Sequence, residues 1–390
     1  MEAIAVWLAG VFPELGLPAA RLIVQVIYSL VLAFGVPVVV VVGYTYMERK
    51  VIARLQDRIG PNRAGPFGVL QGIADAIKML TKEDVTPARA DRVVFNLAPG
   101  LATVAAILAF AVLPIAPGVI GSDLQAGILY VVAVGALGEL AALMAGWSSD
   151  NKYALLGAFR VVAQLITYEV PMVIAIIMVV MASGSMRLGD IVAAQDVPFL
   201  ITLPVAFFIF FVATVAEIGR SPFDLMEAES EIVAGFHVEY SGMKFAFFFI
   251  AEYVHLFAGA GIITSLFLGG WRGPFAGEGS ILGVILGLIY FVLKTTVVIF
   301  VMMWVRGTLP RLRIDHLLDL GWKFLTPLGL VTLIALALVL KLPVLSSPLL
   351  KWVAMLAANG VVIVLTLVYL IWAARRSRSV TLRSMAGVEG

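Results

Sequence analysis

Apolar residues along this chain form long runs that are separated by shorter polar segments. Each run holds about 20 residues, the length at which an α-helix crosses the hydrocarbon core of a bilayer. The pattern predicts nine transmembrane spans, at residues 22–46, 93–113, 127–147, 161–181, 199–218, 245–269, 281–305, 324–340 and 353–373. We therefore expect an all-α, polytopic membrane helix bundle, with a single membrane domain at residues 1–375 and a basic cytoplasmic tail at residues 376–390.

The longest polar segment, residues 48–87, follows the first span. Two turn signals in it, Gly60-Pro61 and Gly65-Pro66, predict that the chain folds back close to the membrane. After Pro66, apolar residues recur at helical spacing, at Val69, Leu70, Ile73, Ile77 and Leu80. This spacing predicts an amphipathic helix at residues 66–80, lying at the membrane interface or against the bundle.

The composition agrees with a membrane protein and limits its chemistry. Hydrophobic residues make up 62% of the chain and charged residues only 13%, against about 25% charged residues in soluble domains. The chain has no Cys, which excludes disulfides, thiolate metal sites and Cys-ligated iron–sulfur clusters. Its three His residues, His237, His255 and His316, lack the spacing of a metal site. We therefore expect no metal site, and any electron chemistry must come from a partner.

The positions of Lys and Arg predict the orientation of the bundle. The loops after spans one, three, five, seven and nine hold 21 of these residues, against five on the other side. Positive residues concentrate on the cytoplasmic side of membrane proteins. We expect the N-terminus outside and the C-terminus in the cytoplasm. A cleavable signal is not expected, because Glu2 and Glu14 stand where a basic region would lie and the first apolar run reaches full spanning length.

The cytoplasmic loop between spans five and six is unusually acidic. It holds two basic residues, Arg220 and Lys244, and six carboxylates: Glu217, Asp224, Glu227, Glu229, Glu231 and Glu239. Clustered carboxylates repel one another and raise one another's pKa unless cations or protons intervene. The residues alone leave three interpretations open: a solvated acidic face, a cation site, or a docking and proton-entry surface. The basic loop after span seven, with Arg306 and Arg311, offsets these acids if the two loops meet.

Several ionisable residues lie inside the predicted spans. They are Glu139, Glu169, Glu217, Glu252, His255 and Lys294. A charged side chain at bilayer depth costs a few kcal/mol unless it faces a polar interior, so such residues indicate a functional site. Glu252 is equally consistent with a side chain that reaches back to the interface. Glu139, Glu169 and Glu217, in three successive spans, favour a proton relay.

Several ordered motifs resemble those of one family, the quinone-site membrane subunit of respiratory complex I, which is the H-type subunit of bacterial NADH:quinone oxidoreductase. In the first loop these are Glu48-Arg49-Lys50, Arg58-Ile59-Gly60-Pro61-Asn62, Gly65-Pro66-Phe67-Gly68, Ala74-Asp75 and Lys82-Glu83-Asp84. In the second loop they are Ala216-Glu217, Arg220-Ser221-Pro222-Phe223-Asp224-Leu225, Glu227-Ala228-Glu229-Ser230-Glu231 and Val238-Glu239-Tyr240. Gly146-Trp147-Ser148-Ser149 and Leu320-Gly321-Trp322-Lys323 complete the match.

The resemblance implies a quinone chamber and a proton path. The implied quinone-binding residues are Glu48, Arg54, Arg58, Phe67, Arg220, Phe223, Asp224 and Arg306. The implied relay residues are Asp75, Glu139, Glu169, Glu217, Glu227, Glu229 and Glu231. Quinone, either ubiquinone or menaquinone, would be the substrate, with FMN and iron–sulfur clusters only in partner subunits. The implied partners are peripheral-arm quinone-reducing and iron–sulfur subunits, antiporter-like and small membrane subunits, and the lipid bilayer of the bacterial inner or plasma membrane; no nucleic acid is expected.

Two other functions remain open at this point. One is the homologous membrane subunit of a membrane-bound hydrogenase or formate hydrogenlyase, which keeps the carboxylates without binding quinone. The other is an independent proton or cation transporter, against which the lack of internal repeats argues. The small departures from the family pattern are Met226, His237 and His316, and none of them removes a carboxylate.

Overall fold

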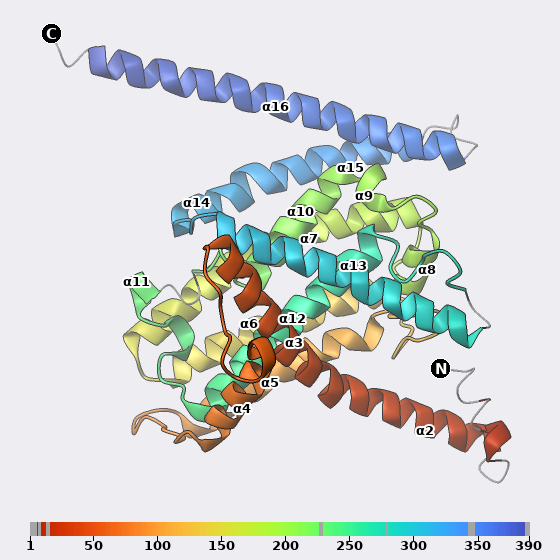
Figure 1. Ribbon diagram of the computed structural model, residues 1–390. Coiled ribbons are helices and arrows are strands. Elements are labelled where there is room, and N and C mark those ends of the chain that lie inside the picture. The colour runs from red at the N-terminus through yellow and green to blue at the C-terminus, as the bar shows by residue number, and fades with distance from the viewer. Residues whose placement is uncertain are drawn as a thin grey trace.

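The computed structural model describes residues 6, 9–12, 16–225, 229–277, 280–341 and 348–386. Within these ranges the regular structure is helical, apart from an isolated bridge between Ala116 and Val119. The helices pack side by side as one bundle, as Figure 1 shows, while α2 (Gly16–Leu30) and the end of α16 (Pro348–Ala386) extend beyond it. The expected all-α polytopic bundle is confirmed.

Eight helices of the described chain are long and apolar enough to cross a membrane. The first is α2 joined to α3 (Val36–Leu55) by the π-helical turn Val31–Gly35, and the eighth is α16. The six between them are α5 (Arg92–Leu108), α6 (Gly127–Ser148), α7 (Lys152–Ser183), α12 (Gly242–Phe267), α13 (Ile281–Thr308) and α15 (Thr326–Leu340). Helix α5 continues into the 3₁₀ turn Ala109–Val112. Helix α15 is preceded by α14 (Ile314–Asp319) and the π-helical turn Leu320–Leu325. The shorter elements are the 3₁₀ turns Pro66–Gly68 and Gly235–His237 and the helices α4 (Gln71–Thr81), α8 (Leu188–Ala193), α9 (Phe199–Thr202), α10 (Pro204–Glu217) and α11 (Glu229–Ile232).

The span predicted at residues 199–218 is divided into two helices, α9 and α10. The division falls at Leu203 and Pro204, because proline has no N–H for an intrahelical bond and disfavours a helical residue before it. At 1.5 Å per residue, α10 alone is about 21 Å long, shorter than the hydrocarbon core of a bilayer. It is nevertheless central, since it packs against α7, α12, α15 and α16.

Two other helices differ in length from the sequence prediction. Helix α7 begins at Lys152 rather than near residue 161, because the Asn151 side chain accepts a hydrogen bond from the Tyr153 N–H at 2.9 Å and caps the helix. Helix α16 continues to Ala386, through most of the segment expected to be a tail. No Pro or Gly interrupts residues 361–386, and Ala, Leu, Met and Arg all favour helix.

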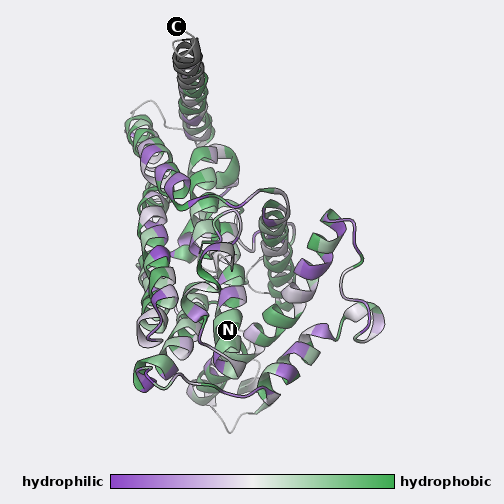
Figure 2. Ribbon diagram, turned by 90° about the vertical axis from the view of Figure 1, so that its left-hand side faces the viewer, coloured by the Kyte–Doolittle hydropathy of each residue, from purple (hydrophilic) through white to green (hydrophobic). Residues whose placement is uncertain are grey.

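Small residues allow the central helices to pack closely. On α12, Gly259 faces Thr214 of α10, and a Cβ added at this glycine would lie 2.8 Å from the Thr214 methyl group. Close backbone approach of this kind is typical of membrane helix interfaces. The outer faces of the bundle carry exposed apolar side chains such as Leu338 and Val364, and Figure 2 shows hydrophobic residues along most of the length of the long helices.

Gly157 of α7 is the packing position at which we expect a single methyl group to matter. An added Cβ would lie 2.8 Å from backbone atoms of Gly235 and Phe236, which cannot move as a side-chain end can. Gly157→Ala should therefore lower the free energy of unfolding of the detergent-solubilised protein by about 1–3 kcal/mol, and its unfolding temperature should fall accordingly. Gly138→Ala on α6 is the matched control, because its added Cβ would meet no heavy atom within 4 Å beyond its chain neighbours and the backbone of its own helix. Equal unfolding temperatures for the two variants would contradict this packing argument.

Candidate functional site

The first polar loop folds back onto α3, as its Gly-Pro turns predict. Gly68 has a φ of +82°, and a Cβ there would lie 2.3 Å from the Pro61 carbonyl oxygen, so only glycine fits this turn. Helix α4 then lies against α3 and α12. Arg49 of α3 binds Asp75 of α4 at 2.7 Å, and the Tyr46 hydroxyl donates a hydrogen bond to the Phe67 carbonyl at 3.1 Å.

The end of the first loop is attached to the start of α12. The Ser241 hydroxyl donates to the Glu83 carbonyl at 3.1 Å and accepts from the Val85 N–H at 2.9 Å. Lys244 pairs with Asp84 at 3.0 Å, and its ammonium lies 5.2 Å from the centroid of the Phe95 ring. The loop after span one and the loop before α12 therefore form one connected surface.

The basic loop after α13 meets the acidic loop after α10. Arg311 binds Asp224 at 2.8 Å, and the Leu312 N–H donates to the Pro222 carbonyl at 3.0 Å. Buried Gln164 of α7 fixes the same segment, because its amide donates to the carbonyls of Ala216 at 2.7 Å and Phe223 at 2.9 Å. The charges of the two loops thus offset one another where they meet, as the sequence indicated.

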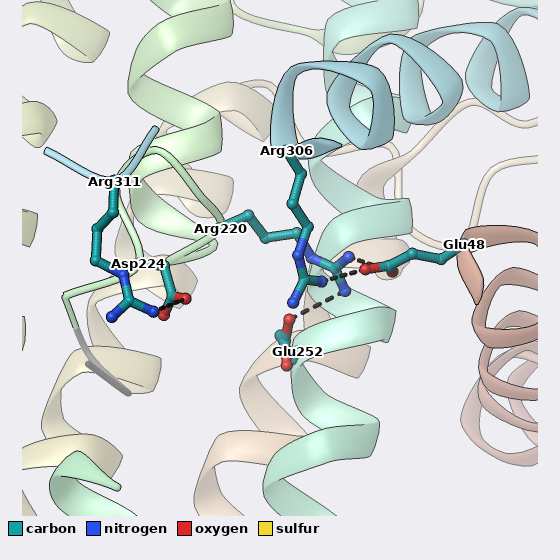
Figure 3. Close-up of polar contacts among 6 residues, drawn as sticks. All are labelled: Glu48, Arg220, Asp224, Glu252, Arg306 and Arg311. Atoms are coloured by element: carbon teal, nitrogen blue, oxygen red, sulfur yellow. Dashed lines mark hydrogen bonds and ion pairs between the residues drawn. The ribbon is translucent and has the colours of Figure 1, made fainter. Parts of the chain in front are cut away.

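Two arginines and two glutamates form a charge cluster with a buried centre between these loops and the bundle. Figure 3 shows Arg220 lying between Glu48 of α3 and Glu252 of α12, with Arg306 of α13 also reaching Glu48. The Arg220–Glu252 contact measures 3.0 Å, and the Arg220 guanidinium lies 4.6 Å from the Tyr253 ring centroid. Glu48 and Arg220 are each only 3% exposed, so their charges depend on this pairing.

The electrostatic balance at Arg220 follows from these partners. Burial acts to lower the pKa of Arg220, but the carboxylates of Glu252 and Glu48 outweigh burial and raise the pKa above its ordinary value. The guanidinium therefore stays charged. Its Nε is buried and has no hydrogen-bond acceptor among the described residues. A buried donor of this kind is free to bind a ligand or a water molecule.

A cavity of about 160 Å³ adjoins the cluster. Its walls are largely apolar and come from α5, α6, α7, α10, α12 and α13. Its ionisable lining residues are Glu139, Glu217, Arg220, Asp224, His237, Glu252, His255 and Arg306. An apolar cavity with a few convergent polar groups is typical of a small-molecule site.

The three carboxylates predicted as a relay lie around a second, smaller cavity of about 10 Å³. It is lined by Glu139, Glu169 and Glu217, and it has roughly the volume that one water molecule needs. Glu139 and Glu217 line both cavities, so the two adjoin. Gly135 leaves room for Glu217, because an added Cβ would lie 2.9 Å from its Oε1.

Asp75 and Glu231, also predicted for the proton path, are not among the residues that line the two cavities. Asp75 pairs with Arg49 and Lys78 on the first loop. Partial burial acts to raise the pKa of Asp75, but the hydrogen bond and charge of Arg49 outweigh it and hold the pKa below its ordinary value. Glu231 pairs with Arg160 of α7. Glu227 and the side chain of Glu229 lie outside the described residues.

The predicted quinone-binding residues separate into two groups. Glu48, Arg220, Asp224 and Arg306 belong to the charged region at and beside the large cavity. Arg54, Arg58 and Phe67 are instead exposed on the first loop, and Phe223 is buried with its ring 5.3 Å from that of Tyr168. Sequence reasoning did not assign Glu252 and His255 to the site, although their place within one span was a signal.

Comparisons with known proteins show the family of this chain. A family model described as NADH dehydrogenase matches residues 27–337. The chain belongs to this family. The H-type subunit of NADH-quinone oxidoreductase from Dehalococcoides mccartyi strain CBDB1 is 50% identical over 314 residues, covering 80% of this chain and 86% of the relative.

Two further relatives are H-type subunits of the same enzyme. The one from Geobacillus kaustophilus is 51% identical over 294 residues, covering 75% of this chain and 87% of the relative. The one from Geobacter metallireducens is 45% identical over 324 residues, covering 80% of this chain and 96% of the relative. The resemblance to this complex I subunit is thus confirmed, and the chain is a multi-pass membrane member of that enzyme-subunit family.

Proposed function

We propose that this chain forms the membrane half of a quinone chamber in NADH:quinone oxidoreductase and couples quinone reduction to proton translocation. The observation that carries the proposal is the pair of adjoining cavities. One end holds the paired cations Arg220 and Arg306 beside the cytoplasmic loops. The other end holds Glu139, Glu169 and Glu217 within the membrane bundle. A ligand that gains electrons and protons beside the two arginines can change the electric field at the three carboxylates.

The large cavity suits a quinone headgroup. Its alanine, valine, isoleucine and phenylalanine lining favours an apolar ring and tail. The buried Nε of Arg220 offers a donor for a quinone oxygen, and the charge of Arg306 would stabilise negative charge that develops on it. Glu48 would orient both cations, while Asp224, held by Arg311, would border the cavity. Arg54, Arg58 and Phe67, on the exposed first loop, would border the access route rather than the headgroup.

The carboxylates would hold and pass protons inside the bundle. Glu139 and Glu217 face the large cavity, and Glu169 adjoins them through the small cavity. Carboxyl groups held in an apolar interior tend to keep a proton at neutral pH, which a relay requires. Asp75, Glu227, Glu229 and Glu231 would act at the cytoplasmic side of this path. Reduction of the quinone would alter the field on the relay and so drive proton movement.

The surroundings of the chain follow from the same proposal. Ubiquinone or menaquinone would be the substrate, reduced by electrons that peripheral-arm subunits deliver from FMN and iron–sulfur clusters. Antiporter-like and small membrane subunits would continue the proton path. The complex would lie in a bacterial inner or plasma membrane, with the N-terminus of the chain outside. The names of the relatives favour this function over a hydrogenase subunit or an independent transporter.

Photo-crosslinking in the assembled complex tests the placement of the quinone. An analogue with a photoreactive headgroup should label the segment Gly219–Asp224 and the region of α12 around Glu252, and excess quinone should prevent the labelling. These segments line the large cavity. An analogue with the reactive group at the tail end, used as the control, should label other positions. The headgroup analogue could instead label only lipid-facing residues of α16, with excess quinone preventing that labelling. This result would refute the proposed chamber.

A further inference from the structure

His255 of α12 lies between the two ends of the proposed site. Its Nε2 is 3.7 Å from Oε1 of Glu217 on α10, and both residues line the large cavity. Glu252 stands three residues earlier on the same helix, a spacing that places two side chains on one helix face. Glu252 in turn contacts Arg220 at 3.0 Å. His255 is therefore next to the charge cluster on one side and the relay carboxylates on the other.

The other ionisable groups around this cavity hold different positions. Glu139 of α6, Asp224 and Arg220 of the loop after α10, His237 near the 3₁₀ turn Gly235–His237, and Arg306 of α13 complete the lining. Asp224 is engaged by Arg311, and Arg306 by Glu48. Burial lowers the pKa of His237 to about 4, so that imidazole is neutral at pH 7. His255 contacts the relay carboxylate Glu217 from within the lining of this cavity.

We propose that His255 is a proton carrier between the large cavity and Glu217. This inference rests on the proposed function, because it names one further residue in the same path. In the transfer, a proton from the cavity side binds to Nδ1 of the neutral imidazole, and the Nε2 proton passes to the Glu217 carboxylate. The imidazole is again neutral, Glu217 is protonated, and one proton has crossed the ring. A ring flip or the reverse tautomerisation resets the carrier.

Imidazole is suited to this position for a chemical reason. A neutral imidazole can accept a proton on one ring nitrogen while it donates a proton from the other. The 3.7 Å separation is slightly longer than a hydrogen bond, so a small side-chain movement or a water molecule would complete the contact. A glutamine at this position would keep a donor for Glu217 but would transfer no proton.

The first test is His255→Gln in the assembled complex, reconstituted into liposomes. NADH-driven proton translocation should fall by at least about tenfold, since positioned acid–base groups contribute factors of this order or more. NADH oxidation by ferricyanide, which needs no quinone, should stay unchanged and so report intact assembly. His316→Gln is the matched control, because His316 is exposed on α14 and lies outside the cavity lining. Translocation at the wild-type rate in His255→Gln would overturn the inference.

A second variant separates proton transfer from a structural role. His255→Ala removes the ring and enlarges the cavity, so added imidazole should restore translocation several-fold while having little effect on the wild-type complex. Slow translocation that imidazole does not improve would also overturn the inference, in favour of a packing role for the ring. The underlying function is tested separately by variants at Glu169 and Glu217. If those variants impair translocation and His255→Gln does not, only the role of His255 fails.

Discussion

Arg220→Met is expected to reduce NADH:quinone activity by roughly 100-fold or more, in line with the cost of removing one member of a buried charge pair. Arg220 is 3% exposed and contacts Glu48 and Glu252, so its loss leaves the buried carboxylate of Glu48 and the partly buried one of Glu252 with less compensation. The same change should lower the free energy of unfolding by about 3–5 kcal/mol. Quinone titration of the assembled complex and thermal unfolding in detergent measure the two effects.

A double variant distinguishes the two effects of Arg220. Combining Arg220→Met with Glu48→Gln removes one positive and one negative charge and leaves Glu252 and Arg306 in the cluster. We expect it to recover much of the lost stability without recovering quinone activity. Lys323→Met is the control, because its ion pair with Asp319 is exposed and contributes little. Full quinone activity in either Arg220 variant would exclude this guanidinium from the quinone site.

The membrane spans were predictable from the sequence because helix length and apolar composition are local properties. The spans near residues 93–113 and 127–147 match α5 with its 3₁₀ turn and α6 to within one residue at each end. The division of α9 from α10 was missed, because mean hydropathy over 20 residues does not register the missing N–H of Pro204. Helix α7 was predicted too short because its first turns carry Lys152 and Arg160, which a search for apolar runs excludes.

The composition of the candidate site was predictable, but its pairing was not. Motifs identified Glu48, Arg220 and Arg306 as residues of interest, yet Glu48 and Arg306 are separated by 258 positions in sequence. Contact between such residues depends on how the helices pack, which no local pattern contains. The sequence around Glu252 likewise does not specify its contacts, since it is equally consistent with a side chain that reaches the membrane interface. Its contact with Arg220 decides the matter.

Some predicted residues lie where the family motif alone would not place them. Phe223 lies within a motif of charged and turn residues, but its ring packs against Tyr168 in the core. Asp75 is predicted to continue the acidic path, and it binds Arg49 between α3 and α4. This pairing gives Asp75 a role in holding the first loop on the bundle. A motif therefore identifies a residue without specifying which way its side chain points.

The double variant Glu169→Gln and Glu217→Gln is expected to have the other large effect. Both side chains line the small cavity with Glu139, and glutamine keeps their size and hydrogen bonding but carries no proton. Loss of proton-carrying groups should slow NADH-driven proton translocation by roughly 100-fold. Glu83→Gln combined with Asp315→Asn is the matched control, because both carboxylates are exposed and lie outside the two cavities.

The number of protons moved per electron, together with the rate, tests the coupling of quinone reduction to the carboxylates most directly. It is measured with the assembled complex in sealed liposomes, from NADH absorbance and a pH-sensitive dye. For the Glu169→Gln and Glu217→Gln double variant, we expect quinone-linked proton translocation near the detection limit while oxidation of NADH by ferricyanide is unchanged. Translocation at the wild-type rate and with the wild-type proton-to-electron ratio would contradict this expectation.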